Sequence, residues 1–320
     1  MRVLVTGGAG SIGSVVTARL LEEGHAVTVL DDLSTGHADA VGDGATLAQG
    51  TIHEAGALLE RGDFAVVVHL AASSIVAESI SDPERYRFNN VVGTERLLAA
   101  MHAAGTRRIV FSSSAAVYGE PDIVPIEEDA PTNPVNPYGA SKLADDRALA
   151  AAAAKHGFGA VSFRYFNVAG AHGRLGERHD PETHLIPLAL RAVLGRSAAL
   201  TVFGEDYPTA DGTCVRDYIH VADLADAHLL ALGATAEAGH RVYNLGNGAG
   251  FSVREVLAAV GEVTGRAVPT TLGPRREGDP AVLVASSARA HAELGWAPRR
   301  NDLREMVADA WRPMAGAHGR

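Results

Sequence analysis

Short apolar runs alternate with longer helical patterns through the first half of the chain. The predicted strands are residues 3–6, 26–31, 64–70, 108–112 and 160–165, and the predicted helices are residues 10–23, about 83–104, and 138–156. Near-continuous Val and Leu runs separated by helices are typical of a parallel sheet that is covered on both faces. The pattern therefore predicts an α/β fold with a Rossmann-like, doubly wound parallel sheet.

The character of the sequence changes after about Gly170, where Gly, Pro, His and Arg become frequent and the elements shorten. We expect a Rossmann-like domain over residues 1–168 and a smaller C-terminal lobe over residues 169–320. A segment near residues 215–245 is expected to return to the first domain, because Arg241 to Leu245 has the pattern of a further strand.

Composition limits the partners and the location. The 320 residues carry 28 Lys and Arg against 38 Asp and Glu, and this formal charge of −10 disfavours a nucleic-acid partner. Cys214 is the only cysteine, so neither an intrachain disulfide nor a cysteine-based metal cluster can form. The first apolar run is too short for a signal peptide, and no run approaches the ~20 apolar residues of a membrane span. We therefore expect a cytoplasmic protein that binds no membrane.

A glycine-rich turn follows the first predicted strand. The segment T-G-G-A-G-S-I-G, Thr6 to Gly13, fits G-x-G-x-x-G from Gly8 and fits T-G-x-x-G-x-x-G from Gly7. Glycines let the backbone approach a pyrophosphate, whose charge the following helix N-terminus accepts. The segment predicts a dinucleotide site, with a plain turn as the alternative.

Two carboxylates end the second predicted strand. Asp31 and Asp32 follow Gly13 by 18 and 19 residues. A carboxylate at this place accepts hydrogen bonds from an adenosine ribose and repels a 2′-phosphate, which favours NAD over NADP. A strand end that is acidic only for solubility is the alternative.

A phenol and an ammonium lie four residues apart in N-P-Y-G-A-S-K, Asn136 to Lys142. This spacing places Tyr138 and Lys142 on one helix face. The strand that ends in F-S-S-S brings serines to the carboxyl edge of the sheet, where ligands of such sheets bind. We predict a proton-transfer site with Tyr138 as the base, Lys142 lowering the pKa of Tyr138 by its charge, and a serine bound to the substrate hydroxyl.

Several segments together carry a family resemblance. The chain resembles, essentially end to end, the UDP-galactose (UDP-glucose) 4-epimerases of the extended short-chain dehydrogenase/reductase family. The matching segments are T-G-G-A-G-S-I-G, D-D-L-S-T-G-H (31–37), F-N-N-V-V-G-T (88–94), S-S-S-A-A-V-Y-G (112–119), N-P-Y-G-A-S-K, R-Y-F-N-V-A-G-A (164–171), D-G-T-C-V-R-D-Y-I-H-V (211–221) and R-R-E-G-D (275–279).

The resemblance implies a reversible exchange at C4 of a UDP-hexose, UDP-glucose or UDP-galactose, through a 4-keto sugar and tightly bound NAD. Tyr138, Lys142 and Ser114 match the catalytic residues of the family. It also implies a homodimer formed through the helices from about Pro83 and from Tyr138. A sister 4-epimerase acting on a UDP-N-acetylhexosamine, UDP-uronic acid or UDP-pentose, and a non-catalytic NAD-binding regulatory protein, are the alternatives.

The resemblance assigns two sets of contacts. The expected NAD contacts are Gly7, Gly10, Ser11, Ile12, Gly13, Asp31, Asp32, Ile52, Leu70, Ala71, Ala72, Asn89, Ser112, Tyr138, Lys142 and Tyr165. The expected UDP-sugar contacts, mainly in the second lobe, are Ser114, Tyr138, Asn167, His184, Leu185, Phe203, Arg216, Tyr218, Arg276, Asp279 and Leu283. The forks of Arg216 and Arg276 suit a diphosphate; pairing with Asp217 or Glu277 is the alternative.

Two departures from the family concern the cofactor. Thr51 stands where relatives carry an Asp beside the adenine, and Ser73 and Ser74 stand where relatives commonly carry a basic or amide side chain. Both changes predict weaker NAD retention.

Other positions concern the reaction and the substrate. Ala115 and Ala116 follow Ser114 where dehydratases and decarboxylases of this fold carry an acid, which favours redox chemistry without elimination of water. His184 replaces an Asn of relatives and could preserve its hydrogen bond. Leu283 occupies the position that gates the space around the C2 substituent, and its intermediate size predicts UDP-glucose and UDP-galactose as main substrates with slow N-acetylhexosamine turnover.

The fourteen histidines raise the question of a metal. They show no H-x-x-x-H or comparable ligand spacing, so we expect no metal site.

Overall fold

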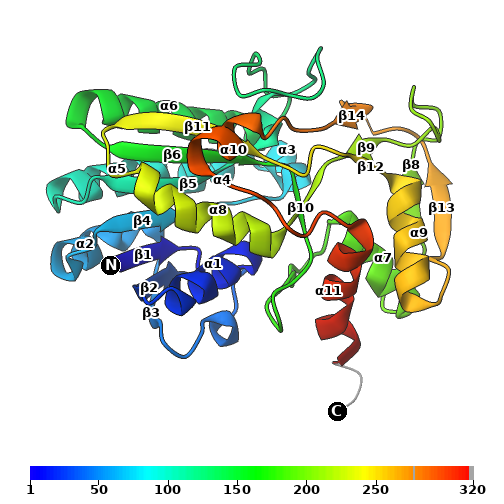
Figure 1. The fold of residues 1–320 in the computed structure, drawn as a ribbon, viewed down its shortest axis with the longest axis horizontal. Helices are drawn as coiled ribbons and strands as arrows, with labels where there is room; N and C mark the ends of the chain where they lie inside the picture. Colours follow the sequence, from blue (N-terminus) through cyan, green and yellow to red (C-terminus); the bar gives the residue numbers. More distant parts are fainter. Residues whose placement is uncertain (277, 317–320) are drawn as a thin grey trace.

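The computed structural model describes residues 1–276 and 278–316 and consists of a large sheet with a smaller lobe at its carboxyl edge (Figure 1). All seven strands of the sheet are parallel, in the order β11-β6-β5-β4-β1-β2-β3. The strand order reverses between β1 and β4, and ligands of such sheets bind at this switch point. The strands are β1 (Arg2–Thr6), β2 (Ala26–Asp31), β3 (Thr46–Gln49), β4 (Val66–His69), β5 (Arg108–Ser114), β6 (Gly159–Tyr165) and β11 (Gly239–Leu245).

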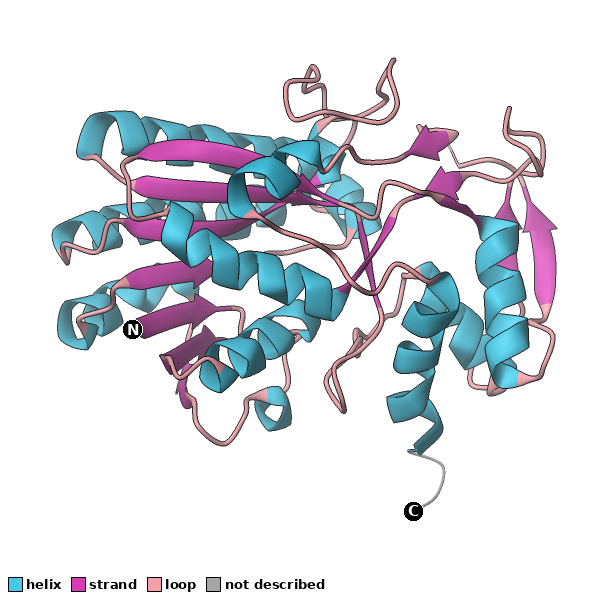
Figure 2. Ribbon diagram, viewed as in Figure 1, coloured by secondary structure: helices cyan, strands magenta, loops and turns pink. Residues whose placement is uncertain are grey.

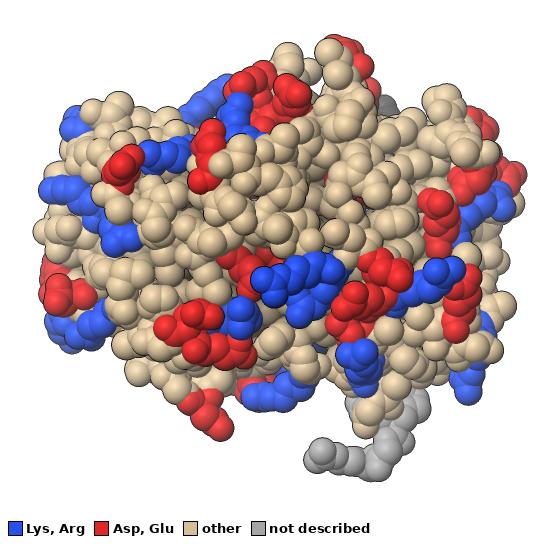
Figure 3. All heavy atoms as spheres, viewed as in Figure 1, with Lys and Arg blue, Asp and Glu red and all other residues tan. Residues whose placement is uncertain are grey.

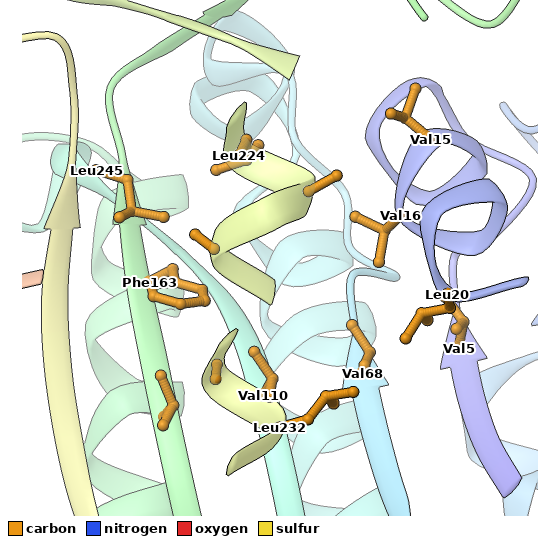
Figure 4. Packing of buried hydrophobic residues seen from close by; sticks show 14 of the residues in the cluster. Val5, Val15, Val16, Leu20, Val68, Val110, Phe163, Leu224, Leu232 and Leu245 are labelled. Carbon is orange, nitrogen blue, oxygen red and sulfur yellow. The ribbon is translucent and has the colours of Figure 1, made fainter. Parts of the chain in front are cut away.

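Helices cover both faces of the sheet (Figure 2). Alternate side chains of one strand enter different cores: Val3 and Val5 join the cluster under α1 and α8, whereas Leu4 joins the cluster under α2, α5 and α6. Figure 4 shows Leu224 and Leu232 of α8 packed over the sheet. The predicted doubly wound α/β fold is confirmed. The covering helices are α1 (Ser11–Glu22), α8 (Val221–Ala234) and α10 (Ala288–Leu294) on one face and α2 (Ala55–Gly62), α5 (Gly93–Ala103) and α6 (Pro137–His156) on the other.

The single helix predicted from about residue 83 to 104 is wrong in detail. The chain forms α3 (Val76–Ser81), α4 (Pro83–Tyr86), a π-helical stretch η3 (Arg87–Val92) and then α5. Asn90 in η3 is buried, and its amide donates to Ser73 O and Ser141 Oγ at 3.1 and 2.9 Å. The widened turn therefore presents a polar side chain to the sheet edge, which apolar periodicity does not show. The short edge strand β3 was also absent from the prediction.

The smaller lobe has its own core. Helices α7 (Leu185–Val193), α9 (Val253–Thr264) and α11 (Leu303–Gly316) pack around a cluster that includes Leu190, Val260 and Met306. The chain returns to the sheet at β11, which pairs with β6. The short strands of this half are β7 (Asn167–Ala169), β8 (Leu200–Phe203), β9 (Val215–Arg216), β10 (Tyr218–His220), β12 (Phe251–Ser252), β13 (Thr270–Gly273) and β14 (Val282–Leu283), and the remaining turns of helix are η1 (Ala38–Ala40), η2 (Ile52–Glu54) and η4 (Ala115–Val117).

The surface carries both signs of charge. Figure 3 shows acidic and basic side chains interspersed over the face that it presents. Within residues 1–276 and 278–316, none of the helices combines the length and apolar character that crossing a bilayer requires.

Candidate active site

The glycine-rich turn is shaped by close backbone approach. Gly7 has φ +72°, and a Cβ there would lie 2.5 Å from the Ala71 nitrogen at the end of β4. A Cβ on Gly13 would lie 2.0 Å from the Gly7 oxygen. Gly10 begins α1 without a side-chain cap, so the first N–H groups of that helix are free of a capping side chain. The turn leaves room where a pyrophosphate approaches a helix N-terminus, which fits a dinucleotide.

Asp31 holds this turn from the neighbouring strand. Its carboxylate is buried and accepts from the N–H groups of Ala9 and Leu33, both at 2.9 Å. Burial raises the pKa of Asp31, and the two backbone hydrogen bonds oppose that shift. A carboxylate has about four acceptor sites, so capacity for a ribose remains. Asp32 is exposed and accepts from the Ser34 N–H at 2.9 Å.

The remaining predicted NAD contacts border the same edge. Leu70 follows β4 and donates its N–H to Thr6 O at 3.0 Å, which brings Ala71 and Ala72 next to the glycine turn. Asn89 donates to Ser73 Oγ at 3.0 Å. Thr51 caps η2, and its hydroxyl donates to Glu54 Oε2 at 3.1 Å. The next residue, Ile52, is buried.

Two members of the predicted NAD set have internal partners. The Ser11 hydroxyl donates to Glu177 Oε2 at 3.1 Å, and Ile12 packs against the core. The Tyr165 hydroxyl lies 2.6 Å from His228 Nε2 inside the core. The structure therefore places Ser11 at the glycine turn but gives its hydroxyl a protein partner.

Tyr138, Lys142 and Ser114 meet at the carboxyl end of β5. Asn136 caps α6 by accepting from the Gly139 N–H at 2.8 Å, and Tyr138 lies in the first turn of this helix. Lys142 is buried and donates to Ser112 O at 2.8 Å, with its Nζ 5.9 Å from the centre of the Tyr138 ring. Ser114 hydrogen-bonds the Tyr138 hydroxyl, and this bond lowers the pKa of Tyr138.

Burial dominates the electrostatics of this cluster. Burial raises the pKa of Tyr138, and only the Ser114 hydrogen bond lowers it among the resolved causes. Burial therefore outweighs the lowering in this arrangement, and the prediction that the Lys142 charge lowers the pKa of Tyr138 stays a prediction. Burial brings the pKa of Lys142 itself down to about 8, and its ammonium is directed to a backbone carbonyl.

Asp145 is a member of this cluster that the sequence analysis missed. It is 1% exposed on α6, one turn after Lys142, and neither carboxylate oxygen has a hydrogen-bond partner of good geometry among the described residues. Burial raises the pKa of Asp145 to about 7, and the nearby Lys142 charge opposes the shift. The signal was present as an acid three residues after the lysine, on the same helix face.

The two arginines predicted to bind the diphosphate have different partners in the structure. Arg216 is ion-paired with Asp279, so the expected ribose contact is the partner of the expected phosphate contact. The guanidinium of Arg276 lies over the Phe203 ring at 4.0 Å from its centre. Asn167 is exposed at the start of β7. Glu277, the alternative partner for an arginine, lies outside the described residues.

Asp217, the other alternative partner, has a different role. It is completely buried and accepts from the N–H groups of Asn247, Gly248 and Ala285 at 2.6, 2.9 and 3.0 Å. It thereby fixes the segments after β11 and β14 beside Arg216. The pairing of Arg216 with Asp217 is not the one that forms.

The sugar end is bounded by apolar side chains. Leu283 on β14 packs against a cluster with Ala115, Val117 and Phe166, directly after the Ser114 strand end. Tyr218 is buried in the core of the lobe, where burial raises its pKa, so it serves packing in this structure. Leu185 begins α7, which follows His184.

A search against models of protein families gives a match over residues 3–246, to a model described as the NAD dependent epimerase/dehydratase family. The chain belongs to this family.

Similar members of the epimerase/dehydratase family are named for one activity. A UDP-glucose 4-epimerase of Streptomyces lividans is 55% identical, with 97% of this chain and 95% of the relative covered. The crystal structure of UDP-glucose 4-epimerase from Brucella ovis in complex with NAD has a TM-score of 0.94 at 46% identity and 97% coverage of both chains. The Bifidobacterium longum UDP-glucose 4-epimerase in complex with NAD+ and UDP has a TM-score of 0.93 at 36% identity, covering 99% and 98%.

In this member of the epimerase/dehydratase family, one cluster of side chains bears on the expectation of no metal site, which stays a prediction. Glu177, His179 and His184 are brought together, with ligand atoms within 4.8 Å of one another. His184 pairs with Glu182 at 2.7 Å, so the predicted UDP-sugar contact already has a carboxylate partner. In the sequence these residues form the spacing E-x-H-x-x-E-x-H, which is not a helical ligand spacing such as H-x-x-x-H.

Proposed function

We propose that the chain catalyses the reversible epimerisation at C4 of a UDP-hexose, UDP-glucose and UDP-galactose, through a 4-keto intermediate and bound NAD. The observation that carries the proposal is the meeting of Tyr138, Lys142 and Ser114 beside a turn whose glycines leave space for a pyrophosphate. Relatives named UDP-glucose 4-epimerase, at up to 55% identity over nearly the full length, support it.

The proposed proton route runs through the phenol. Tyr138 Oη accepts the proton of the C4 hydroxyl while Ser114 Oγ, which hydrogen-bonds that phenol, holds the same hydroxyl in place. The turn at Gly7, Gly10 and Gly13 with Asp31 would hold NAD, which would supply the hydride acceptor for oxidation at C4 and the hydride donor for reduction of the 4-keto sugar. Lys142 supplies positive charge next to the site and fixes the end of β5 through Ser112 O.

The residues that we propose to bind the UDP part of the substrate lie in the smaller lobe. Arg276 and the exposed Asn167 are the groups best placed to bind the diphosphate. Arg216 reaches a phosphate by exchanging its Asp279 partner, which frees that carboxylate for the ribose. The uncharged wall formed by Ala115 and Leu283 leaves the sugar without an acid for elimination, so oxidation is followed by reduction.

The test uses purified protein with UDP-galactose, UDP-N-acetylgalactosamine and UDP-galacturonate in separate tubes without added NAD, followed by proton NMR. We expect UDP-galactose to convert to UDP-glucose. Tyr138→Phe should lower kcat by ~100- to 10,000-fold, the usual contribution of a positioned acid–base group. Tyr243→Phe is the matched control, since it removes a hydroxyl that donates to Glu293 on α10 at 2.8 Å.

Each other outcome selects an alternative. Conversion of UDP-galacturonate or UDP-N-acetylgalactosamine alone would indicate a sister epimerase. If none of the three converts even with added NAD, the regulatory NAD-binding protein replaces this proposal.

We further propose a homodimer in the cytoplasm. The support for the dimer is an exposed apolar group on α3 and η3, where Val76, Ile80 and Phe88 are 42%, 67% and 50% exposed. Single apolar side chains are common on monomers, whereas larger contiguous apolar patches mark interaction surfaces, and we propose that these three side chains belong to such a patch.

A further inference from the structure

Glutamate and histidine side chains converge on the connection between β7 and α7, the green loop beside α1 in Figure 1. Glu177, His179 and His184 direct ligand atoms that all lie within 4.8 Å of one another. His184 Nδ1 lies 3.7 Å from Glu177 Oε2, and His179 Nδ1 bonds Glu177 Oε1. Bonds of ~2.0–2.1 Å in a tetrahedral zinc site place donors about 3.3 Å apart. Small shifts would therefore let the three groups share one ion.

A fourth side chain, that of Glu182, is buried against His184. The Glu182 side chain is 0% exposed, and its Oε1 accepts from the Thr183 and His184 N–H groups at 2.8 Å and pairs with His184 Nδ1 at 2.7 Å. Its Oε2 is buried without a hydrogen-bond partner among the described residues. A buried carboxylate oxygen without a partner is costly, and a cation beside it would offset that cost.

We propose that Glu177, His179 and His184 bind a divalent transition metal ion, with Zn²⁺ preferred, and that Glu182 orients His184 by holding its Nδ1, which leaves Nε2 for the ion. Imidazole and carboxylate donors together suit zinc, whereas Mg²⁺ and Ca²⁺ favour sites made of oxygen. A carboxylate behind a ligating histidine fixes its ring and raises its basicity. The side chain of His184 is 50% exposed, so the ion can enter from solvent and keep a position for water.

The ion would join two parts of the molecule. Glu177 also accepts from Ser11, the first residue of α1, and His184 directly precedes α7. Arg178 between them pairs with Asp39 beyond β2. A metal here ties the start of α1 to the start of α7. If the NAD site is as proposed, removal of the metal should speed NAD release.

The test is metal binding by untagged full-length protein. The protein is stripped with EDTA, desalted and titrated with ZnCl₂ against a fluorescent chelator, and bound metal is counted by plasma mass spectrometry. We expect about one Zn²⁺ per chain. His179→Ala and the isosteric Glu177→Gln should weaken binding at least ~100-fold, beyond the 10- to 100-fold typical of an outer-shell change.

The matched control is His156→Ala, because the His156 ring faces His102 at 4.2 Å between centres, far along the chain from this loop. The control should bind zinc like the wild type. Circular dichroism confirms folding of each variant, and zinc should raise the Tm of the wild type and of His156→Ala but not of Glu177→Gln. No zinc binding by the wild type would overturn the proposal in favour of plain ion pairs. Equal binding by wild type, His179→Ala and Glu177→Gln would overturn it in favour of other histidines.

Discussion

At the scale of single residues, the charges of Lys142 and Asp145 stabilise each other in a buried position. Burial lowers the pKa of Lys142 to about 8 and raises the pKa of Asp145 to about 7, and each charge opposes the shift of the other. Each charge therefore supports the other in a place where burial disfavours both. The charge beside Tyr138 depends on an acid that takes no part in the chemistry.

Asp145→Asn should move the pH dependence of catalysis. Asp145 raises the pKa of Lys142, so its loss lowers that pKa below about 8, and the ammonium loses its proton at lower pH. We expect the alkaline fall of kcat/KM to shift to lower pH by about one unit, a typical effect of one nearby charge. The measurement is a pH–rate profile of the NAD-loaded enzyme. The exposed Glu60→Gln on α2 is the control, and an unchanged alkaline limb in Asp145→Asn would refute this coupling.

Leu283→Ala should widen the substrate range. Leu283 packs beside Ala115 at the proposed sugar end, so truncation opens space for an N-acetyl group. We expect kcat/KM for UDP-N-acetylgalactosamine relative to UDP-galactose to rise at least ~10-fold, since removed methylenes change discrimination by 10- to 200-fold. Leu272→Ala, at a 63% exposed position of β13, should leave the ratio unchanged. No turnover of the N-acetyl sugar by either the wild type or Leu283→Ala would count against a gate at this position.

At the scale of elements, the glycine turn shows how much a short motif can predict. The positions where the backbone packs most closely, Gly7 and Gly13, are those of the T-G-x-x-G-x-x-G spacing. A Cβ on Gly8 would lie nearest to the side chains of Val29 and Thr17. Gly8, which belongs to the G-x-G-x-x-G spacing, therefore lets the turn pack against β2. The motif was predictable because it depends on local backbone geometry.

Gly13→Ala should reduce NAD retention. The added Cβ would lie 2.0 Å from Gly7 O, so the turn must move away from α1. We expect NAD released from the purified variant by acid to fall at least ~10-fold, the effect of about 1.4 kcal/mol on binding. Gly56→Ala on α2 is the control, because its Cβ would make an ordinary 3.9 Å contact with Ala100. Equal NAD content in the two variants would contradict a tight turn at Gly13.

At the scale of the whole molecule, the apolar group on α3 and η3 predicts assembly. We expect light scattering after gel filtration to give twice the chain mass of 33.2 kDa. Ile80→Asp combined with Phe88→Asp should shift the mass toward the monomer, because charges in an apolar interface are costly to bury. Leu230→Asp, at an exposed apolar position of α8, should remain dimeric. A monomeric wild type would exclude the proposed dimer.

The sequence by itself determined the local features of this protein. Most of the strand and helix order in the first half, the glycine turn and the position of Tyr138 and Lys142 on one helix face follow from apolar periodicity and from contacts within a few residues, whereas β3 and the π-helical stretch η3 do not. The domain boundary near residue 168 and the assignment of individual contacts stay predictions.

Only the tertiary structure decided how distant groups are charged and paired. The pairing of Arg216 with Asp279, the burial of Lys142 and Asp145, and the contact of Ser11 with Glu177 depend on how segments pack. Burial sets the pKa values, and burial depends on every element around a group rather than on its neighbours in sequence. For that reason the sequence could propose candidates such as Tyr138 and Lys142, whereas it could not give the partner of Arg216.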